Sequence, residues 1–227
     1  MKPLEILYQK NNLIAINKPH GLLVHRSPIA ADVSEFAIQI LRNQIDQYVY
    51  PCHRLDRKTA GVLLFAMDKT TQVDINTLFQ NRTIDKEYIA IVRGWTDDQM
   101  HIDYALTNEK GKTQEAVSDL TTLSRSEINV PLGKYKTQRY SLVTLKPQTG
   151  RYHQLRKHMA HIRHPIIGDR PHGCNKQNRL FREKWDMMTM MLHAKSLTLP
   201  SPFDITIQAD YSEDFKKVAS ILELVLL

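Results

Sequence analysis

Apolar and polar positions alternate along this chain in short segments that predict many strands. Apolar segments at 4–8 and 13–16 enclose a polar turn, Gln9 to Asn12, whose two asparagines tolerate left-handed backbone conformations. This pattern predicts a β-hairpin. Residues 61–67 form a continuous apolar run, which is typical of a buried strand. Further strands are expected at 88–92, 101–106, 116–123, 139–146, 190–198 and 204–209.

Helical periodicity predicts helices at 34–46, 70–80, 151–162 and 212–225. The last one begins at Ser212, and Glu213 and Asp214 in its first turn suit the positive end of a helix. Strands and helices together indicate an α+β protein.

Residues 124–138 are the least core-like part of the chain, so we expect them to form a loop between two strands. Lys134, Lys136 and Arg139 surround Tyr135 there. Two interpretations stay open: the cations follow a phosphate backbone, or they belong to a solvated loop.

The charge balance favours a polyanionic partner. Of 227 residues, 31 are Lys or Arg and 24 are Asp or Glu, which gives a net charge of +7. A hydrophobic content of 42% suffices for one large domain, or at most two. The only cysteines, Cys52 and Cys174, form no CxxC motif, so we expect a reducing, cytoplasmic location. No apolar run approaches the length of a membrane span.

The candidate chemistry is concentrated between His53 and Gly61. Asp56 is flanked by Arg54, Arg57 and Lys58, whose charges favour an ionised carboxylate. Such a group suits nucleophilic attack or proton removal rather than proton donation. The alternative is a structural ion pair at the start of a strand. A protein-kinase catalytic loop does not fit, because a leucine separates the arginine from the aspartate and no DFG sequence follows.

Four histidines, at 153, 158, 161 and 164, suggest a metal site at first sight. Arginine and lysine side chains alternate with them, however, and no carboxylate or thiol lies among them. Because these cations would repel a divalent ion, we expect phosphate contact or helix packing instead.

The segment His53-Arg54-Leu55-Asp56-Arg57, followed by Thr59 and Gly61, resembles the catalytic motif of the RluA-type pseudouridine synthases. Segments 17–25, 86–94, 149–156, 165–169 and 192–194 resemble the other motifs of this family, in the same order. The resemblance implies the pseudouridine synthase fold: a single catalytic domain over 1–227, with a mixed, largely antiparallel central sheet flanked by helices and loops. It implies no separate N-terminal RNA-binding domain, no metal and no organic cofactor.

The resemblance also implies roles for individual residues. Asp56 would be the catalytic carboxylate, whether it attacks C1′ or C6 or removes a ribose proton. Tyr88 would stack on the uracil and serve in proton transfer, and Arg156 would pair with the catalytic aspartate. Arg54 would replace the flipped base in its helix, and Leu192 would pack against the base pocket. From the residues alone, Tyr88 could be a core aromatic of its strand, and Leu192 would be interpreted as core.

The remaining substrate-binding set expected from the resemblance is His53, Arg57, Arg151 and Lys157. Of these, His53 would act together with Thr59 and Gly61 by shaping the loop.

Shorter stretches at 4–9, 24–27, 90–95 and 177–179 are similar to family members that modify tRNA next to the acceptor stem. They imply tRNA as the partner, uridine 65 at the junction of the T stem and acceptor stem as the target, and a monomer. Tyr152 and His153 depart from that pattern, which is richer in arginine. The alternatives are large-subunit ribosomal RNA or another tRNA position. From other classes they are a non-catalytic RNA-binding protein and, last, a metal-dependent nuclease.

Overall fold

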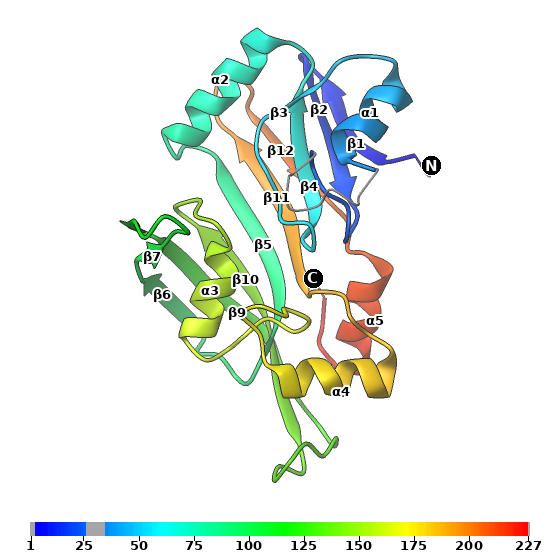
Figure 1. The fold of residues 1–227 in the computed structure, drawn as a ribbon, viewed down its shortest axis with the longest axis vertical. Helices are drawn as coiled ribbons and strands as arrows, with labels where there is room; N and C mark the ends of the chain where they lie inside the picture. The colour runs from blue at the N-terminus through cyan, green and yellow to red at the C-terminus, as the bar shows by residue number, and fades with distance from the viewer. Residues whose placement is uncertain (1–2, 26–34, 227) are drawn as a thin grey trace. The chain divides into compact units, whose positions relative to one another are not determined.

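The computed structural model describes residues 3–25 and 35–226. The chain divides into two compact units, one of Met1–Lys86 and Ala194–Asp210 and the other of Glu87–His193 and Tyr211–Leu227. Two strands, β5 (Asp85–Arg93) and β11 (Leu192–Leu199), contribute residues to both units (Figure 1). The units are described separately below.

The first unit begins with the predicted hairpin. β1 (Glu5–Lys10) pairs antiparallel with β2 (Leu13–Lys18), and Asn11 and Asn12 between them adopt φ values of 52° and 56°. The left-handed conformation expected of these asparagines is thereby confirmed. β2 in turn pairs antiparallel with β4 (Ala60–Ala66), on which β3 (Tyr50–Pro51) also pairs. The strand order of the sheet continues from β4 to β11, and β11 also pairs antiparallel with β12 (Ile205–Gln208).

All seven residues of β4 are buried, as the continuous apolar run predicts. The core of this unit joins β2, β4 and β11 to α2 (Lys69–Gln80), which packs against β3 and β4 (Figure 1). α2 begins after Asp68, whose carboxylate accepts a hydrogen bond from the Thr71 N–H at 2.8 Å. The other helix is α1 (Ala37–Ile45). Its predicted start at residue 34 lies outside the described residues, as do Arg26 and Ser27 of the segment similar to tRNA-modifying members.

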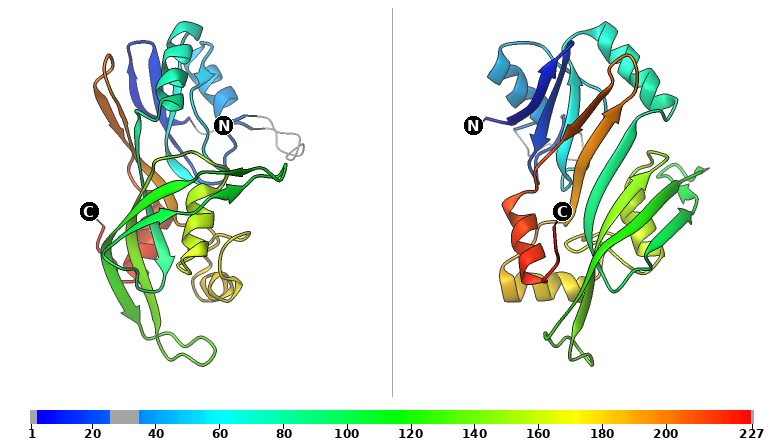
Figure 2. Two further views of the ribbon diagram at one scale, coloured as in Figure 1. Left: turned by 90° about the vertical axis from the view of Figure 1, so that its left-hand side faces the viewer. Right: turned by 180° about the vertical axis from the view of Figure 1, so that it is seen from behind.

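The second unit has the strand order β5-β10-β9-β6, formed by β6 (Gln99–Asp103), β9 (Val117–Ile128) and β10 (Gln138–Pro147). The three pairs are antiparallel, and Figure 2 shows β9 and β10 as a long, twisted ribbon. The strand predicted at 101–106 is divided between β6 and a small separate sheet of β7 (Leu106–Thr107) and β8 (Thr113–Gln114). Three helices complete this unit: α3 (Gln154–His161), α4 (Asn175–Trp185) and α5 (Glu213–Ile221).

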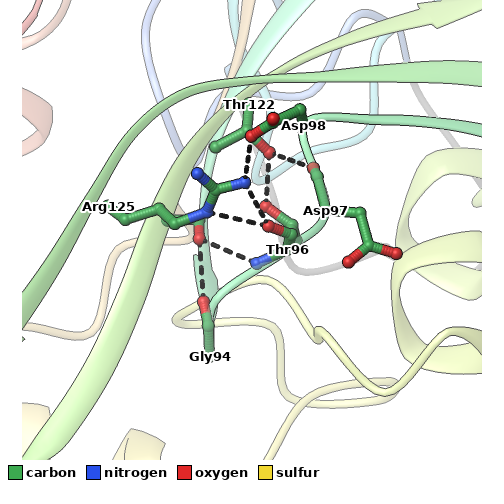
Figure 3. Close-up of polar contacts among 7 residues, drawn as sticks. Gly94, Thr96, Asp97, Asp98, Thr122 and Arg125 are labelled. Atoms are coloured by element: carbon green, nitrogen blue, oxygen red, sulfur yellow. Dashed lines mark hydrogen bonds and ion pairs between the residues drawn. The ribbon is translucent and has the colours of Figure 1, made fainter.

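The predicted loop at 124–138 is wrong in its first third, because β9 continues to Ile128. Arg125 explains why so polar a segment remains in the sheet. Its guanidinium donates two hydrogen bonds to the Thr96 carbonyl, at 2.9 and 2.7 Å, and one to the Asp98 carboxylate (Figure 3). Thr122 meanwhile bonds the Asp97 carbonyl. These side chains satisfy the backbone of the turn after β5, so the loop is confined to 129–137.

α4 was not predicted, because it has few of the usual signals. Its N-cap residue, Cys174, makes no side-chain hydrogen bond, and its first turn contains no acidic residue. The helices and strands that were predicted are present, although their ends are shifted. The α+β class with largely antiparallel pairing is confirmed. Within the described ranges, no helix is both long enough and apolar enough to cross a membrane.

Candidate active site

Asp56 lies in the loop between β3 and β4, and the side chain of Lys18 is hydrogen-bonded to the backbone of this loop. Lys18 is fully buried at the end of β2, and its ammonium donates hydrogen bonds to the carbonyls of Pro19, Leu22 and Arg57 at 3.0, 2.9 and 3.2 Å. Burial lowers the pKa of Lys18 to about 7, although the charge of Asp56 opposes the shift. Lys18 therefore connects the turn after β2 to the residue next to Asp56.

A second set of hydrogen bonds joins the same two segments. The Gly21 N–H donates to the Arg57 carbonyl at 2.8 Å, and the Arg57 Nε–H donates back to the Gly21 carbonyl at 3.0 Å. Within the loop, the Thr59 N–H bonds the Asp56 carbonyl at 3.0 Å. The backbone around Asp56 is thus fixed on both sides before any substrate binds.

Burial alternates along the loop. Leu55 and Thr59 are buried, whereas Arg54 and Arg57 are exposed and Asp56 is half-buried. The apolar and hydroxyl side chains face the interior, so the arginines and the carboxylate are left toward solvent. This arrangement presents one anion among cations to an incoming ligand.

His53 connects the start of the loop to β4 and α2. Its Nε2 accepts a hydrogen bond from the Leu64 N–H at 3.0 Å, and its ring packs on Phe79 with centroids 5.2 Å apart. Burial, aided by the charge of Lys86, lowers the pKa of His53 to about 4. The lowered pKa favours a neutral His53 ring, which accepts the hydrogen bond from β4.

Gly61 allows a close approach of two strands. Its φ is +109°, and a Cβ at this position would lie 2.2 Å from the carbonyl oxygen of Ala194. Gly61, which pairs with Lys18 at the start of β4, therefore lets β4 approach the β11 backbone.

In the second unit, Tyr88 lies on β5 opposite Leu145 of β10 and is half-buried against the core of this unit. Leu192 is 4% exposed and belongs to the same core. Both side chains therefore pack in the core of this unit. This packing is compatible with the contacts to uracil that the family resemblance implies.

Gln154 organises the turn that leads into α3. The amide oxygen of this buried side chain accepts hydrogen bonds from the Thr149 hydroxyl at 2.6 Å and the Arg151 N–H at 3.0 Å. Its NH₂ donates to the Val117 carbonyl and the Ser118 hydroxyl, both at 2.9 Å. The side chain of Arg151 also bonds the Glu115 carbonyl, so its position is fixed as well.

Arg156 forms a buried, bidentate ion pair with Asp169, with both N–O distances 2.8 Å. Burial opposes ionisation of this carboxyl, but the hydrogen bonds and charge of Arg156 outweigh it, and the pKa of Asp169 is lowered. Next to it on α3, the ammonium of Lys157 lies 5.7 Å from the centre of the Tyr152 ring. The segment 149–157 therefore combines fixed and more exposed cations.

The predicted site residues fall into two sets. His53, Arg54, Asp56 and Arg57 share one loop of the first unit, whereas Tyr88, Arg151, Arg156, Lys157 and Leu192 belong to the second unit.

Lys18, Gln154 and Asp169 are among the buried polar residues that were not assigned roles from the sequence. The sequence did contain a signal for these three residues, since each lies within a segment that resembles a family motif.

Two histidines of α3, His158 and His161, contact Tyr104. His158 bonds the Tyr104 carbonyl at 3.1 Å, and the His161 ring stacks on Tyr104 with centroids 3.6 Å apart. Over residues 3–25 and 35–226, no three His, Cys, Asp or Glu side chains form a group that could hold a metal ion.

Comparison with known proteins identifies the class to which this fold and loop belong. Residues 12–161 match the family described as RNA pseudouridylate synthase. The chain belongs to this family, as the resemblance in the sequence predicts.

Individual relatives extend the match over most of the chain. The tRNA pseudouridine synthase C of Vibrio parahaemolyticus is 45% identical over 211 residues, which cover 88% of this chain and 86% of the relative. The enzyme of that name from Salmonella typhi is 44% identical and covers 95% and 88%. Among solved structures, human RNA pseudouridylate synthase domain containing 4 superposes with a TM-score of 0.77 at 26% identity, covering 98% and 94%.

Proposed function

We propose that this protein converts one uridine of tRNA to pseudouridine, with Asp56 as the catalytic carboxylate. The observation that carries the substrate class is the identity of 42–46% to several relatives named tRNA pseudouridine synthase C. In the proposed reaction the N1–C1′ bond breaks, a C1′–C5 bond forms, the proton on C5 leaves and N1 takes up a proton. This balance needs no redox partner and no cofactor.

The loop geometry supports the role of Asp56. Catalysis benefits from groups held in place before the substrate arrives, and Lys18, Gly21 and Thr59 hold the backbone around Asp56. Arg54 is exposed and lies two residues before Asp56 in the chain. We propose that its side chain fills the space left in the RNA helix when the uridine flips out. Tyr88 and Leu192 take the contacts to the uracil, and Arg156 orients the carboxylate.

The further substrate contacts follow from charge. Arg57, Arg151 and Lys157 bind phosphates, and His53 supports the loop from its interior side. We propose uridine 65, at the junction of the T stem and acceptor stem, as the target. We also propose that the protein acts as a monomer in the cytoplasm, with residues 1–227 as one catalytic domain.

Tritium release tests the function directly. A tRNA transcript labelled at C5 of uridine is incubated with the protein and a chelator. We expect one tritium released per tRNA from the wild type and a decrease of about 10²- to 10⁴-fold or more for Asp56→Asn. The matched control is Asp46→Asn, because Asp46 is an exposed aspartate in a left-handed conformation that asparagine also adopts. Equal release by Asp56→Asn and Asp46→Asn would remove Asp56 from the mechanism.

A second transcript, with cytidine in place of uridine 65, tests the position. We expect this change to abolish release while leaving tRNA binding intact. Continued release would assign the activity to another tRNA position, and release from ribosomal RNA fragments alone would replace tRNA as the substrate.

A further inference from the structure

A cavity of about 430 Å³ lies beside α4 in the second unit, and none of the predicted site residues of that unit lines it. Side chains from α4 form one wall, and the segments around Gly168 and Met188 form the other. Figure 1 labels α4, whose colour corresponds to residue numbers around 180 in the bar. The polar side chains that line the cavity are Arg170, Asn175, Asn178, Arg179 and Arg182.

The spacing of residues in α4 explains why these groups share one wall. Asn175, Asn178, Arg179 and Arg182 follow one another at i, i+3, i+4 and i+7, which places them on one face of the helix. The opposite face is fixed to the core by the buried Phe181 and Gln177. Gln177 accepts a hydrogen bond from the Tyr140 hydroxyl at 2.8 Å and donates one to Gln138 at 2.7 Å.

Asn178 fixes the second wall. Its amide oxygen accepts a hydrogen bond from the Gly168 N–H at 3.0 Å, and its NH₂ donates to the Asp169 carbonyl at 2.7 Å. Gly168 adopts a φ of +79°, and a Cβ there would lie 2.1 Å from the Thr189 carbonyl oxygen. Hydrogen bonds and close backbone packing therefore fix both walls of the cavity.

The charge of the cavity is positive. Three guanidinium groups line it, and no carboxylate does. The Asp169 carboxylate is buried in its pair with Arg156, and Glu183 approaches Arg182 only at 3.6 Å between two exposed side chains. Arg170 extends along Met188, with its nitrogen 3.7 Å from the sulfur. Guanidinium groups bind phosphate through paired N–H donors.

We propose that this cavity binds backbone phosphates of the RNA substrate, so that α4 holds the RNA outside the reaction centre. The proposal rests on the proposed function, and it names an additional contact surface for the same substrate. Phosphate contacts position an RNA without reading its sequence, and a concave surface with three arginines suits this role.

Paired variants of α4 test the proposal. Arg179→Gln with Arg182→Gln removes two charges from the cavity wall. Lys176→Gln with Lys184→Gln removes two charges from exposed positions of the same helix that do not line the cavity. Both double variants keep long polar side chains, and equal thermal midpoints would show that both fold. Arg170→Gln removes a charge from the opposite wall and gives an independent variant.

The readout is the dissociation constant for tRNA measured over a series of salt concentrations. Each lost phosphate contact should weaken binding about fivefold at 0.15 M salt and reduce the log–log slope by about 0.9. We expect this loss for the arginine variants, a clearly smaller one for the lysine control, and unchanged single-turnover rates at saturating tRNA.

Arginine variants that bind as tightly as the lysine control, with the same slope, would overturn the proposal. A wild type that binds tRNA with the expected salt dependence but releases no tritium would instead refute the proposed function and leave the cavity as an RNA contact.

Discussion

Lys18 places an ammonium group in a fully buried position, where three backbone carbonyls accept its hydrogen bonds. Replacing it by methionine keeps most of the apolar stem but leaves the carbonyls of Pro19 and Leu22 without this donor. Because each buried, unsatisfied acceptor costs about 1–3 kcal/mol, we expect Lys18→Met to lower the free energy of unfolding by about 2–4 kcal/mol at pH 6. Urea unfolding measures this, with the half-buried Lys86→Met as a control.

The same variant has a distinct pH dependence. The pKa of Lys18 is lowered to about 7 in the fold, so between pH 7 and the ordinary lysine pKa the unfolded chain holds a proton that the folded chain has released. Stability of the wild type relative to Lys18→Met should therefore rise with pH in this window, by at most about 1.4 kcal/mol per pH unit. Parallel pH profiles of the two proteins would show that Lys18 keeps its proton.

Gln154 is the side chain on which the turn before α3 depends. Gln154→Ala leaves the Arg151 N–H and the Thr149 hydroxyl without their acceptor, and we expect a loss of about 2–3 kcal/mol. Gln148→Ala is the control, because Gln148 is exposed and its side chain donates a hydrogen bond to the Asp119 carboxylate at the surface. Equal unfolding free energies for the two variants would contradict this reading of the network.

Asp56 could be proposed from the sequence, whereas the hydrogen bonds of Lys18 and Gln154 could not, and the reason is physical. The charges around Asp56 are neighbours in the chain, so their effect on a carboxylate can be judged locally. Lys18 bonds the backbone of residue 57, and Gln154 bonds that of residue 117. Such long-range contacts depend on strand pairing, which the sequence pattern indicates only in outline. The ion pair of Arg156 with Asp169 likewise depends on the path of the chain between α3 and Asp169, which the sequence pattern does not define.

At the level of elements, β4 and β11 depend on the absence of a side chain at residue 61. A Cβ there would overlap the Ala194 carbonyl, and the φ of +109° is unfavourable for alanine. We expect Gly61→Ala to destabilise the protein by more than about 3 kcal/mol. Gly150→Ala is the matched control, because its Cβ would meet open space. Similar thermal midpoints for both variants would show that the strands can move apart at little cost.

The start of α5 was predicted correctly from Ser212, whose hydroxyl accepts a hydrogen bond from the Phe215 N–H at 3.3 Å. Ser212→Ala should cost about 1 kcal/mol through loss of this cap. Ser220→Ala, at an exposed position of the same helix, should change stability much less. Calorimetric unfolding of both variants provides the comparison, and an equal change would assign the stability of α5 to packing alone.

Local signals decided which elements could be predicted. The hairpin of β1 and β2 and the cap of α5 have turn and cap residues whose effect is local, and both were found. The end of β9 depends on Arg125 bonding a turn some thirty residues earlier in the chain, and α4 lacks a cap and has a largely polar sequence. Both escaped prediction because tertiary contacts stabilise them.

At the scale of the whole molecule, the net charge of +7 and the arginines of the α4 cavity predict that RNA binding depends steeply on salt. Three phosphate contacts alone would weaken binding about 40-fold between 50 and 200 mM monovalent salt, and further contacts would add to this. Filter binding with tRNA measures the slope. A flat response would exclude a phosphate-dominated interface.

Binding and catalysis should respond differently to the substrate. Phosphate contacts carry no sequence information, so a tRNA with cytidine at position 65 should bind with the same salt slope as the natural sequence. Under the proposed function, its turnover should in contrast be lost, because no uridine would reach Asp56. If the cytidine substitution also changed the salt slope, the target base would take part in forming the phosphate contacts. Recognition would then have to begin at the reaction centre rather than on the charged surface of the protein.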